Sequence, residues 1–349
     1  MSLFLFGAFI GSGSASAKDK VFSLRHHDII QVQKFSDWIN AFNFEIHDND
    51  HFGHVFTNWL NNDNFIEVTN YKNLSYTVGH NSFSGYNLEE FSSMMGFRNK
   101  DNVNLRGLEN VIPADPILDA LPKAVDWRGS GVTPVKDQGQ CGSCWSFSTT
   151  GALESAYYNK FGKLVSFSEQ QLVDCDNIKN GGHGDRGCNG GLMDNAFSFI
   201  GKYGGLCSED QYPYVSGVTT TEGTCQKTCQ LVTGSKIASF VDIKPDSDDA
   251  MMSALVKQTV SVAIEADSMD FQLYKSGVFT GKCGTNLDHG VLLVGYNPES
   301  YILKNSWGTS WGDNGYIYLG KGNDPVTGKP YNGGHGQCGV LMQASYPNL

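Results

Sequence analysis

The chain has 349 residues and a formal net charge of −11 at pH 7. Nucleic-acid binding needs a basic patch that contacts phosphates, so this charge argues against nucleic acid as a partner. A prior of one domain per roughly 150 residues predicts two or three structural units.

Residues 1–17 resemble a secretory signal peptide. An apolar run from Leu3 to Ile10 precedes small residues that end in Ala15-Ser16-Ala17, an A-x-A cleavage pattern. The alternative is a frayed apolar start or a partial anchor. The run is too short to span a bilayer, and no later segment reaches about 18 uninterrupted apolar residues. We therefore expect a soluble chain that is processed in the secretory pathway.

The expected secretory routing makes the cysteine count informative. Nine cysteines can form four pairs and leave one free thiol, because secreted proteins pair their thiols. Spacing alone does not assign these pairs, since eight cysteines permit about 105 connectivities.

The segment from Lys18 to about Leu108 is polar, rich in asparagine and free of cysteine, which suggests a separate unit. One helical stripe is predicted from steps of three and four residues; its members are Trp59, Asn62, Ile66 and Asn70. An ordinary amphipathic helix gives the same spacing. Asn73-Leu74-Ser75 is the only plausible glycosylation sequon.

A connector that contains proline, from Pro113 to Pro122, precedes an abrupt change to glycine, cysteine and tryptophan. We expect a domain boundary there. The second unit, from about Leu121, is predicted to have a helix-rich first part and a strand-rich second part.

Cys141 and Cys144 lie in the octet QGQCGSCW, from Gln138 to Trp145. This pair fits half of a zinc site, a redox dithiol, a structural cysteine or a catalytic thiol. A zinc site needs a second ligand pair, which is not found downstream, so no metal is expected. A redox dithiol is typical of short chains with few other cysteines, whereas this chain has nine cysteines, so this alternative is disfavoured.

Periodicity predicts a helix from Ser143 or Cys144 to Phe161, with Gly162 as its stop. The exposed N–H groups at its amino end are expected to lower the pKa of the Cys144 thiol. Ser168 and Gln171 form a predicted capping box for a second helix, which runs through Leu172. The other expected elements are a helix at 194–203 and antiparallel strands at 260–265, 290–296, 301–304 and 316–319.

Three histidines follow the boundary, namely His183, His289 and His335. His289 opens a predicted strand, and Asn305 ends the next one, so hairpin pairing is expected to bring the two together. Trp307 is then placed to cover their hydrogen bond. A surface histidine and a simple packing tryptophan are the alternatives.

Three sequence blocks resemble the papain-like cysteine endopeptidases, namely QGQCGSCWSFS, LDHGV and KNSWGTSWG. His289 follows Cys144 by 145 residues, within the roughly 130 to 150 typical of this family, and Asn305 lies slightly beyond that range. The resemblance is closest to the cathepsin L-like subgroup and covers nearly the whole chain.

The resemblance implies an α+β, papain-like fold of two subdomains, one helical and one an antiparallel, barrel-like β half. It divides the chain into a signal peptide (1–17), a mainly helical inhibitory propeptide (18–120) and a peptidase domain (121–349). The resemblance also implies a zymogen, because the propeptide would block the cleft. Endopeptidase activity is expected, because no insertion resembles the occluding loop of exopeptidase relatives.

By the same resemblance, Cys144 is the nucleophile, His289 the general acid and base, Asn305 the residue that orients the imidazole, and Gln138 an oxyanion donor beside the Cys144 N–H. A thiolate–imidazolium pair would attack a peptide carbonyl and form a thioester, which water hydrolyses. No cofactor is implied.

The family pattern also implies disulfides between Cys141 and Cys188, Cys175 and Cys225, and Cys283 and Cys338. Cys207 and Cys229 remain, and we predict a fourth bridge between them, with a free Cys207 or Cys229 as the alternative. Cys144 is then the only free thiol.

The segment GCNGGLM resembles the family's substrate-binding segment, in which Gly190 and Gly191 pair with the substrate main chain. The pocket for the side chain two residues before the cut is expected to favour apolar groups. By the same resemblance, Gln343 is expected to close the floor of this pocket, where the subgroup has a small apolar residue, so we expect some polar side chains to enter. The implied substrate-binding residues are Gly190, Gly191, Leu192, Met193, Ala263, Leu287, Gly290, Trp307 and Gln343.

The stripe at 59–70 matches the second half of the ERFNIN propeptide pattern. His51 and Val55 stand where that pattern has Glu and Arg, and Gly85 stands where the accompanying GxNxFxD motif has Asp. Six histidines lie in the expected propeptide, at positions 26, 27, 47, 51, 54 and 80. Their protonation in an acidic compartment is one hypothesis for propeptide release, and solvated surface histidines are the alternative.

Two other functions fit parts of the sequence. A silent papain-fold binding or storage protein usually lacks the nucleophile, which is present here, and a cytosolic thiol transferase disagrees with the signal peptide and cysteine pattern.

We expect a lysosomal, vacuolar or extracellular protease with protein and peptide substrates, its own propeptide as inhibitor, and cystatin-like proteins as further inhibitors. The loops at 176–187 and 320–336 are long for the family.

Overall fold

The computed structural model describes residues 26–97, 111–112 and 120–349. The predicted signal peptide and most of the connector from Pro113 lie outside these residues. The chain divides into two compact units, residues 1–45 and 46–349. The first contains helix α1 (His26–Phe42), in which Phe35 and Trp38 are buried and their rings stack at 5.6 Å.

The expected propeptide does not form a compact unit of its own, because residues 46–97 belong to the same unit as the rest of the chain. Its elements in this unit are α2 (Asn49–Tyr71), β1 (Tyr76–Val78), α3 (Leu88–Ser93) and β2 (Val111–Ile112). The side chain of Asp48 caps α2 by accepting a hydrogen bond from the His51 N–H.

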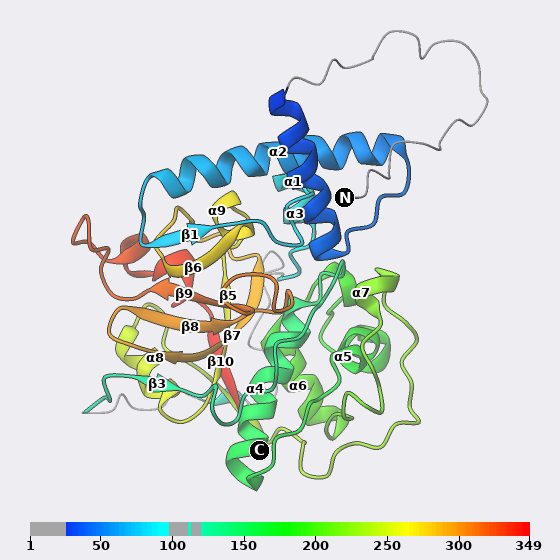
Figure 1. Cartoon of the computed structure of the whole chain (residues 1–349). Coiled ribbons are helices and arrows are strands. Elements are labelled where there is room, and N and C mark those ends of the chain that lie inside the picture. Colours follow the sequence, from blue (N-terminus) through cyan, green and yellow to red (C-terminus); the bar gives the residue numbers. More distant parts are fainter. Residues whose placement is uncertain (1–25, 98–110, 113–119) are drawn as a thin grey trace. The chain divides into compact units, whose positions relative to one another are not determined.

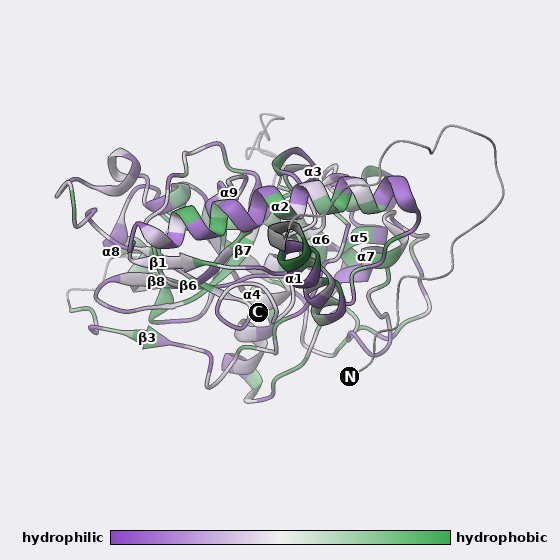
Figure 2. Ribbon diagram, turned by 45° about the horizontal axis from the view of Figure 1, so that its top comes forward, coloured by the Kyte–Doolittle hydropathy of each residue, from purple (hydrophilic) through white to green (hydrophobic). Residues whose placement is uncertain are grey.

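The predicted stripe on α2 is confirmed, and its asparagines form hydrogen bonds to neighbouring backbone. Asn62 Nδ2 donates to the carbonyls of Ser84 (2.9 Å) and Tyr86 (3.0 Å). Asn70 bonds both backbone groups of Val78. The asparagines of this stripe therefore hold the following loop to the helix. Figure 2 shows that hydrophilic and hydrophobic residues alternate along α2.

The helical half contains α4 (Cys144–Phe161), α5 (Glu169–Cys175), α6 (Met193–Tyr203) and α7 (Ser216–Thr219). Two short 3-10 helices lie between α5 and α6, at Ile178–Asn180 and Gly187–Asn189. The prediction for α4 is confirmed, and Gly162 ends it in the left-handed region at φ 66°.

The prediction for α5 was partly wrong. Ser168 caps the helix through the Gln171 N–H, but the Gln171 side chain does not complete a capping box, because its Oε1 accepts from the Cys207 N–H at 2.7 Å. The helix also continues beyond Leu172 to Cys175.

The β half is one sheet in the order β1-β6-β9-β8-β7-β5-β10-β4-β2, with β3 paired to β7 (Figure 1). Among the described residues its two end strands do not pair with each other, so the barrel-like half is an open sheet. Both end strands come from the segment before residue 121. The remaining strands are β3 (Val125–Asp126), β4 (Ser239–Asp242), β5 (Val260–Ile264), β6 (Tyr274–Phe279), β7 (His289–Tyr296), β8 (Ser300–Lys304), β9 (Tyr316–Gly320) and β10 (Ala344–Asn348).

The four predicted strands correspond to β5, β7, β8 and β9, which pair antiparallel in that order. Sequence patterns missed β6 and β10, because β6 contains Gly277 at φ 88° and β10 contains Pro347, both unfavourable in strands. Helices α8 (Asp248–Leu255) and α9 (Met269–Gln272) connect strands of this half, and two 3-10 helices precede β10, at Tyr331–Gly334 and Gln337–Gly339.

The two halves meet where α4 packs against β7. Ser148 Oγ donates to the Val291 carbonyl at 2.7 Å, and the Ser148 carbonyl accepts from Ser261 Oγ at 2.9 Å. A Cβ at Gly151 would lie 2.7 Å from Leu292 Cδ2, so a larger residue there would require the Leu292 side chain to shift. The contact fixes the amino end of α4 beside the start of β7.

Candidate active site

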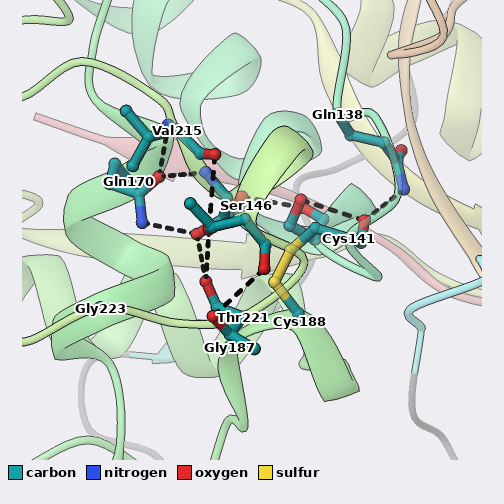
Figure 3. The surroundings of a disulfide bond; sticks show 12 residues. Gln138, Cys141, Ser146, Gln170, Gly187, Cys188, Val215, Thr221 and Gly223 are labelled. Carbon is teal, nitrogen blue, oxygen red and sulfur yellow. Dashed lines mark hydrogen bonds between the residues drawn. A yellow bond between two sulfur atoms is a disulfide. The ribbon is translucent and has the colours of Figure 1, made fainter.

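Cys144 is the first residue of α4 and is fully buried. The turn before it is held by the disulfide between Cys141 and Cys188 and by Gln138, whose Nε2 donates to the Cys141 carbonyl at 3.0 Å. Figure 3 shows Gln138 beside the cystine that anchors this turn. The octet thus contains one cross-linked cysteine and one free cysteine.

His289 is the first residue of β7, and its Nε2 lies 2.7 Å from Oδ1 of Asn305, just after β8. The ring of Trp307 stacks on His289 with centroids 4.5 Å apart. The antiparallel pairing of β7 with β8 places these three side chains together. Within the described parts of the chain, the other ring nitrogen, Nδ1, is buried and has no hydrogen-bond partner.

The strand that begins with His289 reaches the thiol directly, because the Gly290 N–H donates to Cys144 Sγ at 3.3 Å. Gly290 itself must be small here: a Cβ would lie 3.1 Å from the Met193 sulfur and 3.3 Å from Trp145 Cα. The helical half therefore contributes the thiol and the β half contributes the imidazole.

The expected low pKa of the thiol is wrong for this covered state. Burial raises the pKa of Cys144 to about 11, although N–H groups of Gly290, Gly96 and Trp145 act in the opposite direction. Burial likewise lowers the pKa of His289 to about 4, against the hydrogen bond to Asn305. Desolvation of both charged forms outweighs the amino end of the helix.

Gln138 is fully buried and its amide is fixed at both ends. Its Oε1 accepts from Ser306 Oγ at 2.7 Å, while its Nε2 reaches the Cys141 carbonyl. Ser306 follows Asn305, so one short segment orients both the imidazole partner and the predicted oxyanion donor. Ser306 was not predicted from the sequence, because no motif gave a signal for it beyond its place in KNSWG.

Gly96 and Phe97, from the segment before residue 121, cross the site. The Gly191 N–H donates to the Gly96 carbonyl at 3.0 Å, and the Phe97 N–H donates to the Asp288 carbonyl at 2.8 Å. A Cβ at residue 96 would lie 1.9 Å from the Gly142 carbonyl oxygen, so only glycine fits. This crossing, which the sequence did not predict, lies against the thiol: the Gly96 backbone N–H acts on Cys144, and Phe97 belongs to the same buried cluster as Cys144.

The predicted pocket residues lie together beside this crossing. Phe97 belongs to one buried apolar cluster that includes Leu192, Met193, Ala263 and Leu287. The carbonyl of Gln343 accepts from the Ala263 N–H at 3.1 Å, and its side chain is half-buried. Gly190, at φ 100°, adopts a backbone conformation that favours glycine and continues into Gly191.

The structure joins Cys141 to Cys188, Cys175 to Cys225, Cys207 to Cys229 and Cys283 to Cys338. Within residues 120–349, Cys144 is the one free cysteine. His183 and His335 lie away from it, with ring nitrogens 2.9 Å from Ser198 Oγ and 2.8 Å from Asp246 Oδ1.

No cluster of three or more histidine, cysteine or acidic side chains suited to a metal ion occurs in the described residues. Among those same residues, the helices are too short or too polar to cross a membrane. Neither finding bears on the thiol site.

Comparison with known proteins agrees with this geometry. The model of the family "Papain family cysteine protease" matches residues 121–348. The chain is 45% identical to "Probable cysteine protease RD21B" of Arabidopsis thaliana over 81% of its own length, and spans 58% of that relative.

Two solved structures share the fold over most of the chain. A recombinant stem bromelain precursor matches with a TM-score of 0.79 and 34% identity, covering 92% of this chain and 99% of that one. Digestive procathepsin L 3 of Tenebrio molitor larval midgut matches with a TM-score of 0.78 and 32% identity, over 92% and 99% of the two chains. Both comparisons include the region before residue 121, so this chain has the architecture of a proform. Together with the family match over residues 121–348, they show that the chain belongs to the papain family of cysteine proteases.

Proposed function

We propose that the chain is the zymogen of an endopeptidase in which Cys144 is the nucleophile and His289 the general acid and base. The observation that carries this proposal is the convergence of the free thiol, the imidazole and Asn305 at the interface of the two halves. Departure of Gly96 and Phe97 would return water to the site. The burial that now favours the neutral forms would then be relieved, which favours the thiolate–imidazolium pair.

The reaction follows from these positions. The Cys144 thiolate attacks the peptide carbonyl carbon, and the resulting oxyanion accepts hydrogen bonds from the Cys144 N–H and Gln138 Nε2. The C–N bond then breaks as His289 gives its proton to the leaving amine, which leaves a thioester. Water attacks the thioester while His289 takes its proton, and the acid product and thiol are released.

We assign residues 1–17 to a signal peptide, 18–120 to an inhibitory propeptide and 121–349 to the peptidase. The family match that begins at residue 121 and the passage of Gly96 through the site support the last two assignments. A lysosomal, vacuolar or extracellular destination and inhibition by cystatin-like proteins belong to the same proposal. The buried position of Phe97 indicates how a substrate side chain would be held.

Substrate preference is proposed to depend on Gln343, because this half-buried polar residue lies beside the apolar cluster around Ala263. The pocket would take Leu or Phe and also some polar side chains two residues before the cut. If a peptide library were cleaved only when Leu or Phe stood two residues before the cut, the predicted acceptance of polar side chains would be refuted. Gln343→Ala should narrow the profile toward apolar side chains.

The catalytic assignment is tested with the full-length precursor activated in acid. An epoxide-type thiol inhibitor should label Cys144, and a Phe-Arg reporter should be hydrolysed. Cys144→Ala should abolish both, and Gln138→Ala should lower kcat by about 100- to 1000-fold. Labelling without hydrolysis would indicate a silent binding protein instead. His183→Ala, outside the site, is the matched control and should retain activity.

A further inference from the structure

Two aspartates lie buried behind the segment Gly190–Leu192. Asp176 follows α5 and is fully buried, and Asp185, in the long loop before Gly190, is 4% exposed. The two carboxyl groups are close enough to shift each other's pKa, and a hydrogen bond between two carboxyl groups requires a proton on one of them. Apart from this mutual contact, no group in the described parts of the chain donates a hydrogen bond to either oxygen of Asp176 or to Oδ2 of Asp185, and these three oxygens are buried.

Asp185 also holds Gly190–Leu192, the segment that contacts Gly96 of the expected propeptide. Its Oδ1 accepts from the Leu192 N–H and from Asn195 Nδ2, both at 3.0 Å. A Cβ at Gly191 would lie 2.8 Å from the Asp185 carboxyl carbon, so this carboxyl supports Gly191 directly. Gly191 in turn donates to the Gly96 carbonyl in the cleft.

We propose that Asp176 and Asp185 share one proton, and that this acid pair positions Gly190–Leu192 for binding of the substrate main chain. Loss of the proton would place two negative charges side by side in a buried site and loosen the segment. The proposal makes Asp185 a positioning residue, and it rests on the proposed role of Gly191 in substrate binding.

Acidic and basic side chains both surround the pair, and burial is the main cause that raises both pKa values. Three acidic side chains lie near the pair on neighbouring elements, namely Asp194 on α6, Asp174 on α5 and Glu222 on the loop against Gly187. On the pair's own loop, Lys179, His183 and Arg186 are the titratable or basic groups, and Lys202 of α6 donates to the Gly181 carbonyl. The hydrogen bonds that Asp185 accepts come from neutral donors.

Burial raises the pKa of Asp185 to about 7, and burial together with Asp185 raises that of Asp176. Because the folded pKa lies above that of an unfolded aspartate, the native state binds the extra proton. The pair is therefore intact in acid, and its contribution is lost as the pH rises toward and through about 7. Substrate binding should be tight in an acidic compartment and weaker outside it.

The test measures KM and kcat between pH 5 and 7.5 on enzyme that is self-processed from the full-length precursor. Wild-type KM should rise by roughly 5-fold over this range, as expected for one weakened hydrogen bond. Asp185→Asn and Asp176→Asn each replace the shared proton with an amide N–H, so their KM should stay near the value at pH 5. The pH profile of kcat should not change.

Asp185→Ala removes the acceptor for the Leu192 N–H and should raise KM at both pH values. Asp242→Asn removes another carboxyl whose pKa burial raises, on β4, and should keep the wild-type KM profile. The acid pair is refuted if both asparagine variants follow the wild-type profile. An Asp185→Ala enzyme with normal KM at pH 5 would instead refute the proposed role of Gly191. Asp176→Asn provides the same test if Asp185→Asn fails to fold.

Discussion

His289 Nε2 lies 2.7 Å from Asn305 Oδ1, and this contact joins the first residue of β7 to the residue that follows β8. Because Nε2 is committed to Asn305, Nδ1 is the nitrogen that remains for proton exchange with the thiol. In the covered state burial keeps both partners neutral.

In the precursor, Cys144 and His289 should both be uncharged between about pH 4 and 11, since their pKa values are shifted to these limits. Alkylation of Cys144 by iodoacetamide should therefore be slow at pH 5 and at pH 7, and become fast after processing. Rates are measured by mass spectrometry of the peptide that contains Cys144. Equal rates in precursor and processed enzyme would contradict the effect of burial.

Asn305→Ala should lower kcat by about 100-fold or more, because the imidazole loses the partner that orients its ring for proton transfer. KM should change little, since Asn305 does not line the predicted pocket. Steady-state kinetics on the processed enzyme measure both constants. Asn323→Ala, on an exposed loop, is the matched control and should retain wild-type kcat.

Gly96→Ala should produce a leaky precursor. The new Cβ would lie 1.9 Å from the Gly142 carbonyl oxygen and 2.2 Å from its carbon, both backbone atoms that cannot move aside easily. Overpacking of this kind typically costs about 1–3 kcal/mol, so the separate propeptide should inhibit about 10-fold more weakly. Gly53→Ala, on α2 with open space around it, should inhibit normally. Equal inhibition by both variants would show that the crossing adapts.

Acid should strengthen two propeptide contacts. His54 Nε2 lies 2.5 Å from Glu90 Oε1, and His80 Nε2 lies 3.1 Å from Asp63 Oδ1, so protonated imidazoles there attract carboxylates. This sign is opposite to the hypothesis that histidine protonation releases the propeptide. His54→Gln with His80→Gln should therefore speed self-processing at about pH 5 and leave stability at pH 8 nearly unchanged. Slower processing of this variant would restore the release hypothesis.

The Cys207–Cys229 bridge closes a loop with a sequence separation of 22 residues. Loop-closure entropy predicts that replacing both cysteines with alanine lowers the free energy of unfolding by about 3 kcal/mol. Thermal unfolding of the inactive Cys144→Ala precursor, with and without the bridge, measures this loss. Non-reduced peptide mapping is the complementary check, and alkylation of Cys207 in the native protein would exclude the bridge.

The sequence predicted α4 and the four central strands because their periodicity is regular and their ends carry glycine or polar residues. It also placed His289 and Asn305 together, since a hairpin between β7 and β8 leaves few registers. It missed β6 and β10, where glycine and proline interrupt the pattern and pairing with distant strands decides the conformation.

By itself, then, the sequence determined the residue types of the site, their spacing and the odd number of thiols, which are local or countable properties. Only the tertiary structure decided the charge state of Cys144 and His289, because their desolvation depends on packing between elements that lie far apart in the chain. The same holds for Asp176 and Asp185. Their shared proton follows from burial and from mutual contact, and no pattern of neighbouring residues encodes either property.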